Sequence, residues 1–359
     1  MKTFTLLSVL LSMMFMAVSY AAEVPLHLDK KIFTNSCATC HFKTNLKSGG
    51  GVAGCLTCHG NPQRRVDNRK MPKGSVAGLE GLKNIELEFQ KTYRHPVLEA
   101  SGVHKAHENL PEIDPVKPRH SECVDCHNPH YLSKDNKYAG IRGQRLVSHN
   151  NAVSTEAELC YRCHGDSANL PGKYTNKRIE FMLINPSFHP LEGEGKNLAV
   201  VSLIRPYRER RVAIGDISTV TCTDCHGSDD PNGIKGVHGS RYRFILKDNF
   251  DADDNVVESP QAYALCYRCH ARTSILANES FRYHSLHIVG KNSMNRGTSC
   301  FTCHNSHGST EYKYLIRFNR NVVSPNSKGV LKFVEKGSGK FSGECYLSCH
   351  GVDHNPKSY

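Results

Sequence analysis

Sixteen cysteines and twenty-one histidines are the side chains of this 359-residue chain best suited to bind metals or cofactors. All the cysteines fall into eight pairs, and a histidine directly follows the second cysteine of each pair. Seven pairs have two intervening residues, and the last has three. The paired cysteines are Cys37 and Cys40, Cys55 and Cys58, Cys123 and Cys126, Cys160 and Cys163, Cys222 and Cys225, Cys266 and Cys269, Cys300 and Cys303, and Cys345 and Cys349. The histidines that follow them are His41, His59, His127, His164, His226, His270, His304 and His350.

Closely spaced cysteine pairs occur in zinc sites, in disulfides and at the attachment points of c-type haem. Only haem attachment requires the histidine: the thiols form thioethers with the porphyrin, and the histidine becomes the proximal iron ligand. At this histidine content, eight coincidences have a chance probability of about 10⁻¹⁰. Positions i, i+3 and i+4 share one face of a helical turn, so all three groups can reach one porphyrin. We therefore predict eight covalently bound haem c groups.

The chain is poor in the residues that fill a conventional core. Hydrophobic residues make up 38% of it, and tryptophan is absent. Soluble domains usually contain about 45–50% apolar residues, and porphyrins would supply the missing apolar volume. We therefore predict a mostly irregular, small α-helical multihaem cytochrome c fold. Short CxxCH helices, loops and a few β-hairpins would wrap round a chain of paired haems.

The N-terminus has the pattern of a secretory signal peptide, predicted over residues 1–21. Lys2 precedes an apolar run from Leu6 to Val18, and Ser19-Tyr20-Ala21 offers a small-x-small cleavage site. An uncleaved anchor is the alternative, although the run is short for one. No later stretch reaches the roughly 18 apolar residues that a spanning helix needs. We expect an exported protein in the periplasm or at the cell exterior, with outer-membrane association left open.

The sixth coordination position of each iron needs a further ligand, and histidine is the abundant candidate. Eight of the 21 histidines are proximal, which leaves thirteen. Outside the signal peptide the only methionines are Met71, Met182 and Met294. Bis-histidine ligation is therefore predicted for most haems, with lower reduction potentials than His/Met ligation gives.

An internal repeat selects six of the thirteen histidines. One histidine precedes each of three motif pairs in a similar context, and another follows the first motif of each pair at a short distance. The predicted distal ligands are His95, His130, His189, His238, His284 and His307. A histidine three residues after a proximal ligand cannot reach the far side of the same haem. We expect it to cross to a neighbouring haem.

The first and last motifs lie outside this pattern. His27 is the best candidate partner for the first pair, and the eighth ligand is predicted to be His354, which follows the last Cys-His by four residues. Other candidates for the eighth ligand are His104, His107, His120, His149 and His287. The repeat predicts four haem-pair segments after the signal peptide, at residues 22–85, 86–180, 181–276 and 277–359.

The doubled motifs resemble a known family. Cys123-Val-Asp-Cys126-His127-Asn-Pro-His130, followed by Cys160-Tyr-Arg-Cys163-His164, is similar to the arrangement in exported multihaem cytochromes c, and Cys300 to His307 repeats it. Such proteins are typical of bacteria that respire on metals or other extracellular acceptors. The resemblance covers roughly residues 90–359, and it implies electron transfer between haems.

The formal charge of +12 would by itself suggest an anionic partner. Signal removal leaves +11, and sixteen ionised propionates would bring the reduced protein to about −5. Eight ferric irons would then raise the oxidised protein to about +3. Much of the basic excess therefore pairs with propionates, and no basic tract interleaved with aromatic residues indicates nucleic-acid binding.

These features favour an octahaem electron-transfer conduit without catalytic residues, which exchanges electrons with redox proteins or extracellular acceptors. The alternative is a reductase of nitrite, sulfite or a similar oxyanion, which needs one open iron. A further hypothesis is a filament, in which His27 or His354 ligates a haem of the next subunit.

Overall fold

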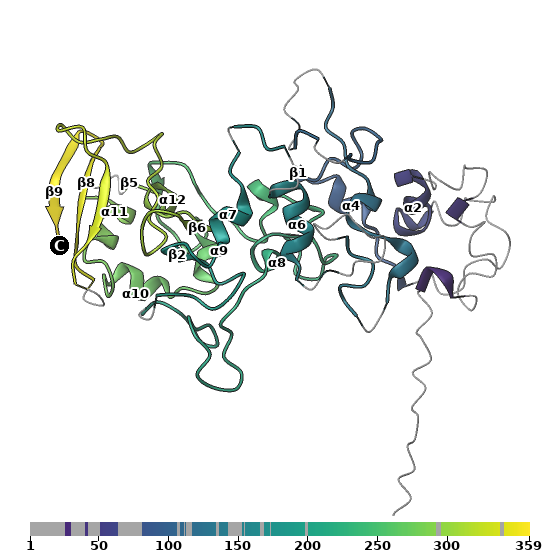
Figure 1. Ribbon diagram of the computed structural model, residues 1–359, viewed down its shortest axis with the longest axis horizontal. Helices are drawn as coiled ribbons and strands as arrows, with labels where there is room; N and C mark the ends of the chain where they lie inside the picture. The colour runs from purple at the N-terminus through teal and green to yellow at the C-terminus, as the bar shows by residue number, and fades with distance from the viewer. Residues whose placement is uncertain are drawn as a thin grey trace, which may run out of the picture.

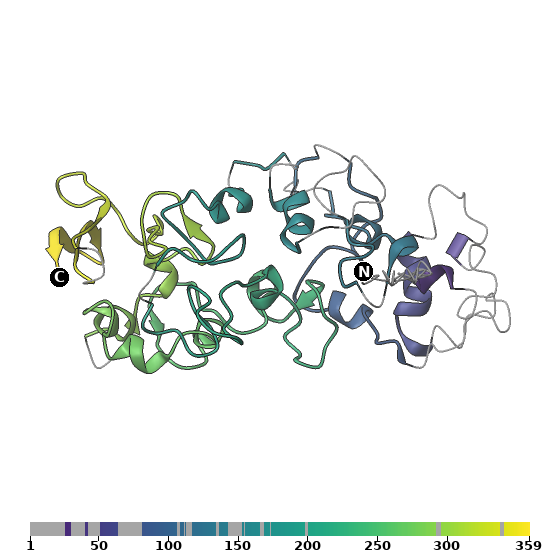
Figure 2. The same ribbon diagram turned by 60° about the horizontal axis from the view of Figure 1, so that its bottom comes forward.

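A computed structural model describes residues 26–29, 40–41, 51–63, 81–105, 108–110, 112, 117–133, 136–142, 153, 155–165, 169–172, 174–197, 200–291, 296–337 and 341–359. The predicted signal peptide and Cys37 lie outside these residues. The described elements run in broadly sequential order along an elongated molecule, from α2 (Gly51–His59) near one end to a small sheet at the other (Figure 1). Figure 2 shows the same progression after a turn about the long axis.

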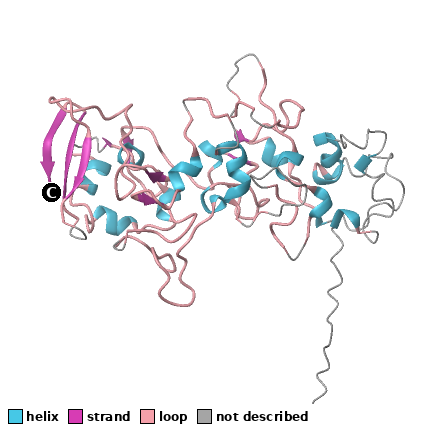
Figure 3. Cartoon of the chain, in the orientation of Figure 1, coloured by secondary structure: helices cyan, strands magenta, loops and turns pink. Residues whose placement is uncertain are grey.

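Loops dominate the structure, and its helices and strands are short (Figure 3). The other helices are η1 Leu26–Leu28, α4 Glu86–Phe89, α5 Cys123–Cys126, η3 Pro129–Tyr131, α6 Ala157–His164, α7 Lys177–Phe181, α8 Cys222–Cys225, η4 Arg243–Ile245, α9 Ala264–Tyr267, α10 Arg272–Leu276, α11 His284–Val289 and α12 Cys300–Cys303. The strands are β1 Tyr93–Arg94, β2 Ser187–Phe188, β3 Gly239–Ser240, β4 Val256–Val257, β5 Arg296–Gly297, β6 Gly308–Ser309, β7 Lys332–Glu335, β8 Gly343–Cys349 and β9 Val352–Ser358.

Two of the motif helices begin with reciprocal side-chain caps. In α5 the side chains of Glu122 and Asp125 each accept a hydrogen bond from the other's backbone, and Thr221 and Asp224 do the same in α8. Such a capping box satisfies donors that a helix start leaves unpaired. The aspartate before the second cysteine therefore stabilises a single helical turn that would be marginal by itself.

Short antiparallel pairs connect each repeat to the next one. Strand β1 pairs with β3, and β2 pairs with β6 in the equivalent way one repeat later. A Cβ on Gly239 would overlap the carbonyl oxygen of Glu88, and one on Gly308 would overlap that of Glu180. Glycine at these two positions therefore lets β3 and β6 approach α4 and α7, which are helices of the preceding repeat, closely.

The C-terminal sheet has the order β7-β8-β9 and is antiparallel throughout. It contains the longest strands in the described part of the chain. Leu347 of β8 lies opposite His354 of β9, and the register shifts between Cys345 and Leu347. The eighth cysteine pair therefore lies on a strand, unlike the helical motifs before it.

Among the described residues, buried apolar side chains gather in small clusters. One contains Ala157, Tyr161 and Phe181, and another contains Ala262, Tyr263 and Ile288. Between such clusters runs a cavity of about 4920 Å³, several times the roughly 300–1,000 Å³ of an ordinary ligand pocket. The scarce core, short helices and small sheets confirm the predicted fold class.

None of the helices in the described ranges is long and apolar enough to cross a membrane. The four predicted haem-pair segments remain a prediction, because the strand pairs join neighbouring segments without marking where one ends.

Candidate haem sites

The cavity is lined by every described cysteine and histidine of the eight motifs. In four motifs the histidine N–H donates to the carbonyl oxygen of the first cysteine, at 2.8 Å for His127, 2.9 Å for His226 and His304, and 3.0 Å for His270. This bond closes one helical turn. Both thiols and the imidazole of a motif therefore lie on one face, as haem attachment requires.

Histidine rings face one another across this cavity in pairs. An imidazole nitrogen lies about 2 Å from a bound metal and its ring centre roughly 1 Å further, so two rings on one iron have centroids about 6 Å apart. Seven pairs, each with one motif histidine and one predicted distal histidine, have centroids 6.0–6.5 Å apart. They are His59 with His27, His41 with His130, His164 with His95, His127 with His238, His270 with His189, His226 with His307, and His304 with His284.

Three of these pairs join different repeats. His130, His238 and His307 each follow one motif but face the histidine of a motif further back in the chain. The strand pairs β1–β3 and β2–β6 lie beside two of these crossings, since the carbonyls of His238 and His307 accept the backbone N–H groups of His95 and His189. The structure therefore places each of these three histidines near the motif histidine of an earlier segment, and ligation of that segment's iron stays a prediction.

The paired rings are held in the form that binds iron. Burial lowers the pKa of His164, His226, His238 and His270 to about 4, so these side chains are neutral at pH 7. Neutral imidazole is the metal-binding form. Nδ1 of His226 lies 2.9 Å from the carbonyl oxygen of Phe244, and Nδ1 of His304 lies 2.8 Å from that of Tyr314. A proton on Nδ1 would donate to these carbonyls and leave Nε2 free for a metal.

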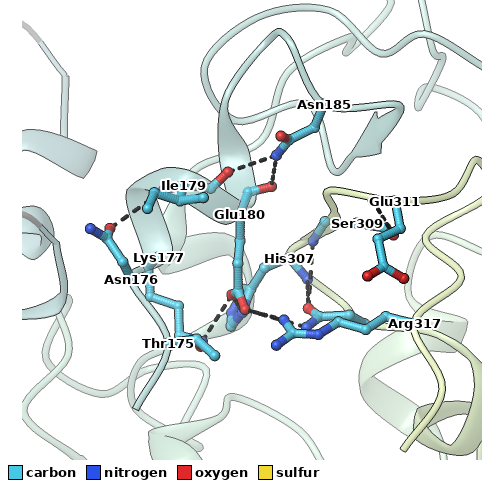
Figure 4. A network of polar contacts seen from close by, with 12 residues as sticks. Thr175, Asn176, Lys177, Ile179, Glu180, Asn185, His307, Ser309, Glu311 and Arg317 are labelled. Atoms are coloured by element: carbon cyan, nitrogen blue, oxygen red, sulfur yellow. Dashed lines mark hydrogen bonds and ion pairs between the residues drawn. The ribbon is translucent and has the colours of Figure 1, made fainter. Parts of the chain in front are cut away.

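A buried carboxylate contacts one of the predicted distal ligands (Figure 4). Glu180, 3% exposed, lies 3.0 Å from Nδ1 of His307 and forms ion pairs with Lys177 at 2.9 Å and Arg317 at 2.6 Å. Burial alone would raise the pKa of Glu180, but His307 and Lys177 bring it well below its usual range. The carboxylate is therefore ionised beside the imidazole. Sequence reasoning missed Glu180 because only the fold brings it near His307.

We predict that Glu180→Gln raises the potential of the haem at Cys222 and Cys225 by tens of millivolts. A carboxylate that accepts the imidazole proton makes the ligand more basic and favours ferric iron, and an amide does this less well. Spectroelectrochemical titration would measure the shift. Glu88→Gln is the matched control, because Glu88 is equally buried one repeat earlier but pairs with Lys91 and Ser228. A titration unchanged by Glu180→Gln would contradict the prediction.

The attachment cysteines of successive motifs lie side by side. Cys55 lies beside Cys123, Cys160 beside Cys222, and Cys266 beside Cys300, and in each case the neighbouring thiol raises the pKa of the first-named cysteine. In the second, third and fourth motif pairs, the second cysteine of the first motif lies near a cysteine of the second motif. Cys163 raises the pKa of Cys126, Cys269 raises that of Cys225, and Cys345 and Cys349 raise that of Cys303. The second to eighth motifs therefore follow one another in space in their sequence order.

The eighth motif departs from the others. His350 has a left-handed backbone (φ 51°), and its Nε2 lies 2.9 Å from Oδ2 of Asp254. His354, the predicted distal ligand, faces His287 of α11 with ring centroids 6.5 Å apart. His287 was one of several candidates for the eighth ligand in the sequence, and no feature singled it out there, although its position one helical turn after His284 is a signal that could have done so.

Two further histidines in the described residues, His104 and His120, face each other and no motif histidine. His104 and His120 have ring centroids 4.5 Å apart, and their Nδ1 atoms contact Asp125 and Glu112 at 3.2 and 2.7 Å. Ligand atoms of His104, Glu112 and His120 lie within 4.8 Å of one another, so they form a polar cluster beside α5. His107 and His149 lie outside the described residues.

A cavity lined by paired cysteines and facing imidazoles fits a multihaem c-type cytochrome. Comparison with family models matches residues 30–239 to the outer membrane cytochrome MtrC/MtrF-like family, domains II/IV. Because the match spans more than half of the chain, the protein belongs to this family. It is an electron-transfer protein rather than an enzyme. Neither the curated proteins nor the solved structures gave a match.

Proposed function

We propose that the chain is an octahaem cytochrome that conducts electrons along one file of covalently attached haems. The main support is the agreement of seven ring pairs, all 6.0–6.5 Å apart, with the spacing of bis-histidine iron. A second support is that cysteines of successive motifs lie close together, so that the second to eighth attachment sites form a continuous series. Electrons would enter near one end of the elongated molecule and leave near the other (Figure 1).

The proposed location is the cell envelope outside the inner membrane, with association at the outer membrane. The predicted signal peptide supports export, and the family description names an outer membrane cytochrome. The electron donor and acceptor would be other redox proteins or extracellular acceptors. Reduced haems with low potentials, as bis-histidine ligation gives, would suit such partners.

We predict eight haems per chain and only low-spin ferric iron in the oxidised protein. Six-coordinate iron with two imidazoles is low-spin, whereas an open site gives high-spin iron that binds cyanide or nitrite. Intact-mass analysis would count the haems, and low-temperature EPR would report the spin states. A stoichiometric high-spin signal would show that one iron has an open position. It would refute the proposal of a conduit in which every haem is six-coordinate.

The reductase alternative has no support in the described part of the chain. An oxyanion reductase needs an iron with one free position, yet each of the seven ring pairs provides two imidazoles. The eighth attachment site also has facing histidines nearby. The geometry therefore favours electron conduction over reduction of a bound substrate.

The filament hypothesis stays open but loses its original motive. His27 faces His59 and His354 faces His287, all within one chain. Ligation of a neighbouring subunit by His27 or His354 would require breaking these contacts. End-to-end assembly would then have to use contacts other than ligation by these two histidines.

A further inference from the structure

Given the haem chain proposed above, we propose that the eighth haem is ligated by His287 and His354, with His350 left out of the coordination sphere. The haem would still be attached through Cys345 and Cys349. Its axial ligands would then both lie outside the Cys-x-x-x-Cys-His segment, in contrast to the seven other sites.

The backbone of the eighth motif does not form the turn that brings a motif histidine beneath its porphyrin. Cys345 and Cys349 lie on β8, and His350 lies in the turn that leads to β9. Alternate residues of a strand share one face, so Cys345, Leu347 and Cys349 project together. His350 follows the strand in a left-handed conformation and does not continue this face.

The side chain of His350 is engaged elsewhere. Its Nε2, the atom that would bind iron, lies 2.9 Å from the Asp254 carboxylate, and the side chain is 47% exposed. Asp254 is itself fixed by a hydrogen bond from Thr298 at 3.0 Å. In the motif histidines His226 and His304, by contrast, the ring atom that contacts a protein acceptor is Nδ1, which leaves Nε2 available for iron.

His354 occupies the face that the cysteines define. It lies opposite Leu347 in the β8–β9 ladder, and side chains of directly opposed residues point to the same side of a sheet. Its Nδ1 is buried without a hydrogen-bond partner. The carbonyl of His354 accepts a hydrogen bond from Asn326 at 3.0 Å, which fixes its backbone.

His287 approaches from α11 on the other side. Its ring centroid lies 6.5 Å from that of His354, within the range of the seven other pairs. Its Nδ1 lies 2.7 Å from the carbonyl oxygen of Tyr283, the same arrangement as in His226 and His304. Phe281 stacks on the ring at 5.6 Å and holds its plane.

The repeat explains why this site needs a substitute ligand. In the two earlier repeats, His95 and His189 face the second motif of their pair, at His164 and His270. In the last repeat the equivalent His284 faces His304 of the first motif instead. The eighth site therefore lacks its regular partner. His287, one helical turn further on, stands where the earlier repeats have Leu98 and Glu192.

Carbethoxylation of the intact holoprotein with diethyl pyrocarbonate, read by peptide mass spectrometry, tests the assignment without mutation. Iron-bound imidazoles are protected, whereas a free and exposed imidazole is modified. We expect modification of His350 and protection of His287 and His354. Protection of His350, or modification of His287 or His354, would overturn the proposal.

Variants provide a second readout by EPR. His350→Ala should retain eight haems and only low-spin signals, whereas His287→Ala and His354→Ala should each convert one haem in eight to high spin. Asp254→Asn is the control and should leave all haems low-spin. A high-spin haem in His350→Ala that is absent from His354→Ala would overturn the ligand set.

The two proposals fail in different ways. If the wild-type protein carries fewer than eight haems or already shows stoichiometric high-spin iron, the octahaem conduit itself is wrong. If the wild-type protein is fully low-spin and His350 is protected, the conduit stands and only the eighth ligand set falls.

Discussion

The chain produced without haem is expected to remain unfolded, with no cooperative thermal transition and rapid digestion by protease. In the described residues only sixteen hydrophobic side chains are buried, and they are dispersed among small clusters. Burial of so few side chains at about 1.5–3 kcal/mol each cannot offset an ordering cost of about 1–2 kcal/mol for every residue. The cavity of about 4920 Å³ would also be left without its apolar contents.

Synthesis of the mature sequence in a compartment without haem attachment would provide the test material. Far-UV circular dichroism, thermal melts and limited proteolysis would compare it with the holoprotein. A cooperative melt of the haem-free chain near that of the holoprotein would show that the polypeptide has a core of its own.

His238→Met is expected to create an electron trap in the middle of the molecule. Methionine in place of an axial histidine raises the haem potential, here by on the order of 100 mV within the ~0.8 V span that axial ligands cover. Because about 59 mV corresponds to a tenfold change in a one-electron equilibrium, electrons would accumulate at the haem of Cys123 and Cys126. We expect a more than tenfold fall in end-to-end transfer at low driving force.

Spectroelectrochemistry would show one haem shifted upward, and transfer from a low-potential dye to a soluble acceptor would give the rate. His120→Met is the matched control, because His120 lies in the polar cluster with Glu112 and faces no motif histidine. Equal effects of the two substitutions would mean that His238 is not an iron ligand.

The attachment chemistry and the fold class could be predicted from the sequence because both depend on local spacing. The cysteine pairs with their histidines fall within five or six residues, and Asp125 or Asp224 provides a local cap for the helical turn. The low apolar content likewise predicts a sparse core without knowledge of any contact.

The pairing of each distal histidine with a motif histidine could be predicted only in part, because it depends on contacts between distant segments. The spacing of His130, His238 and His307 indicated a crossing, but the facing motif depends on contacts between distant segments. For His238 and His307 these contacts include the strand pairs β1–β3 and β2–β6. His284 differs locally from His95 and His189, because Ser285 follows it where prolines follow the other two, and it begins α11. This difference does not by itself show that His284 faces the first motif of its pair while the other two face the second. The strand at Cys345 was also unexpected, since every other motif predicts a turn of helix.

The crossing histidines also constrain the order in which the protein can be completed. On the proposed pairs, the haem of His127 receives its second ligand from His238, and the haem of His226 receives it from His307. A chain that emerges from an export channel N-terminus first would carry each of these haems with an unfilled position until about a hundred further residues had arrived. The second ligand of each of these haems would therefore arrive one repeat after the haem's own motif. A chain cut between repeats would end in a reactive haem with one ligand missing.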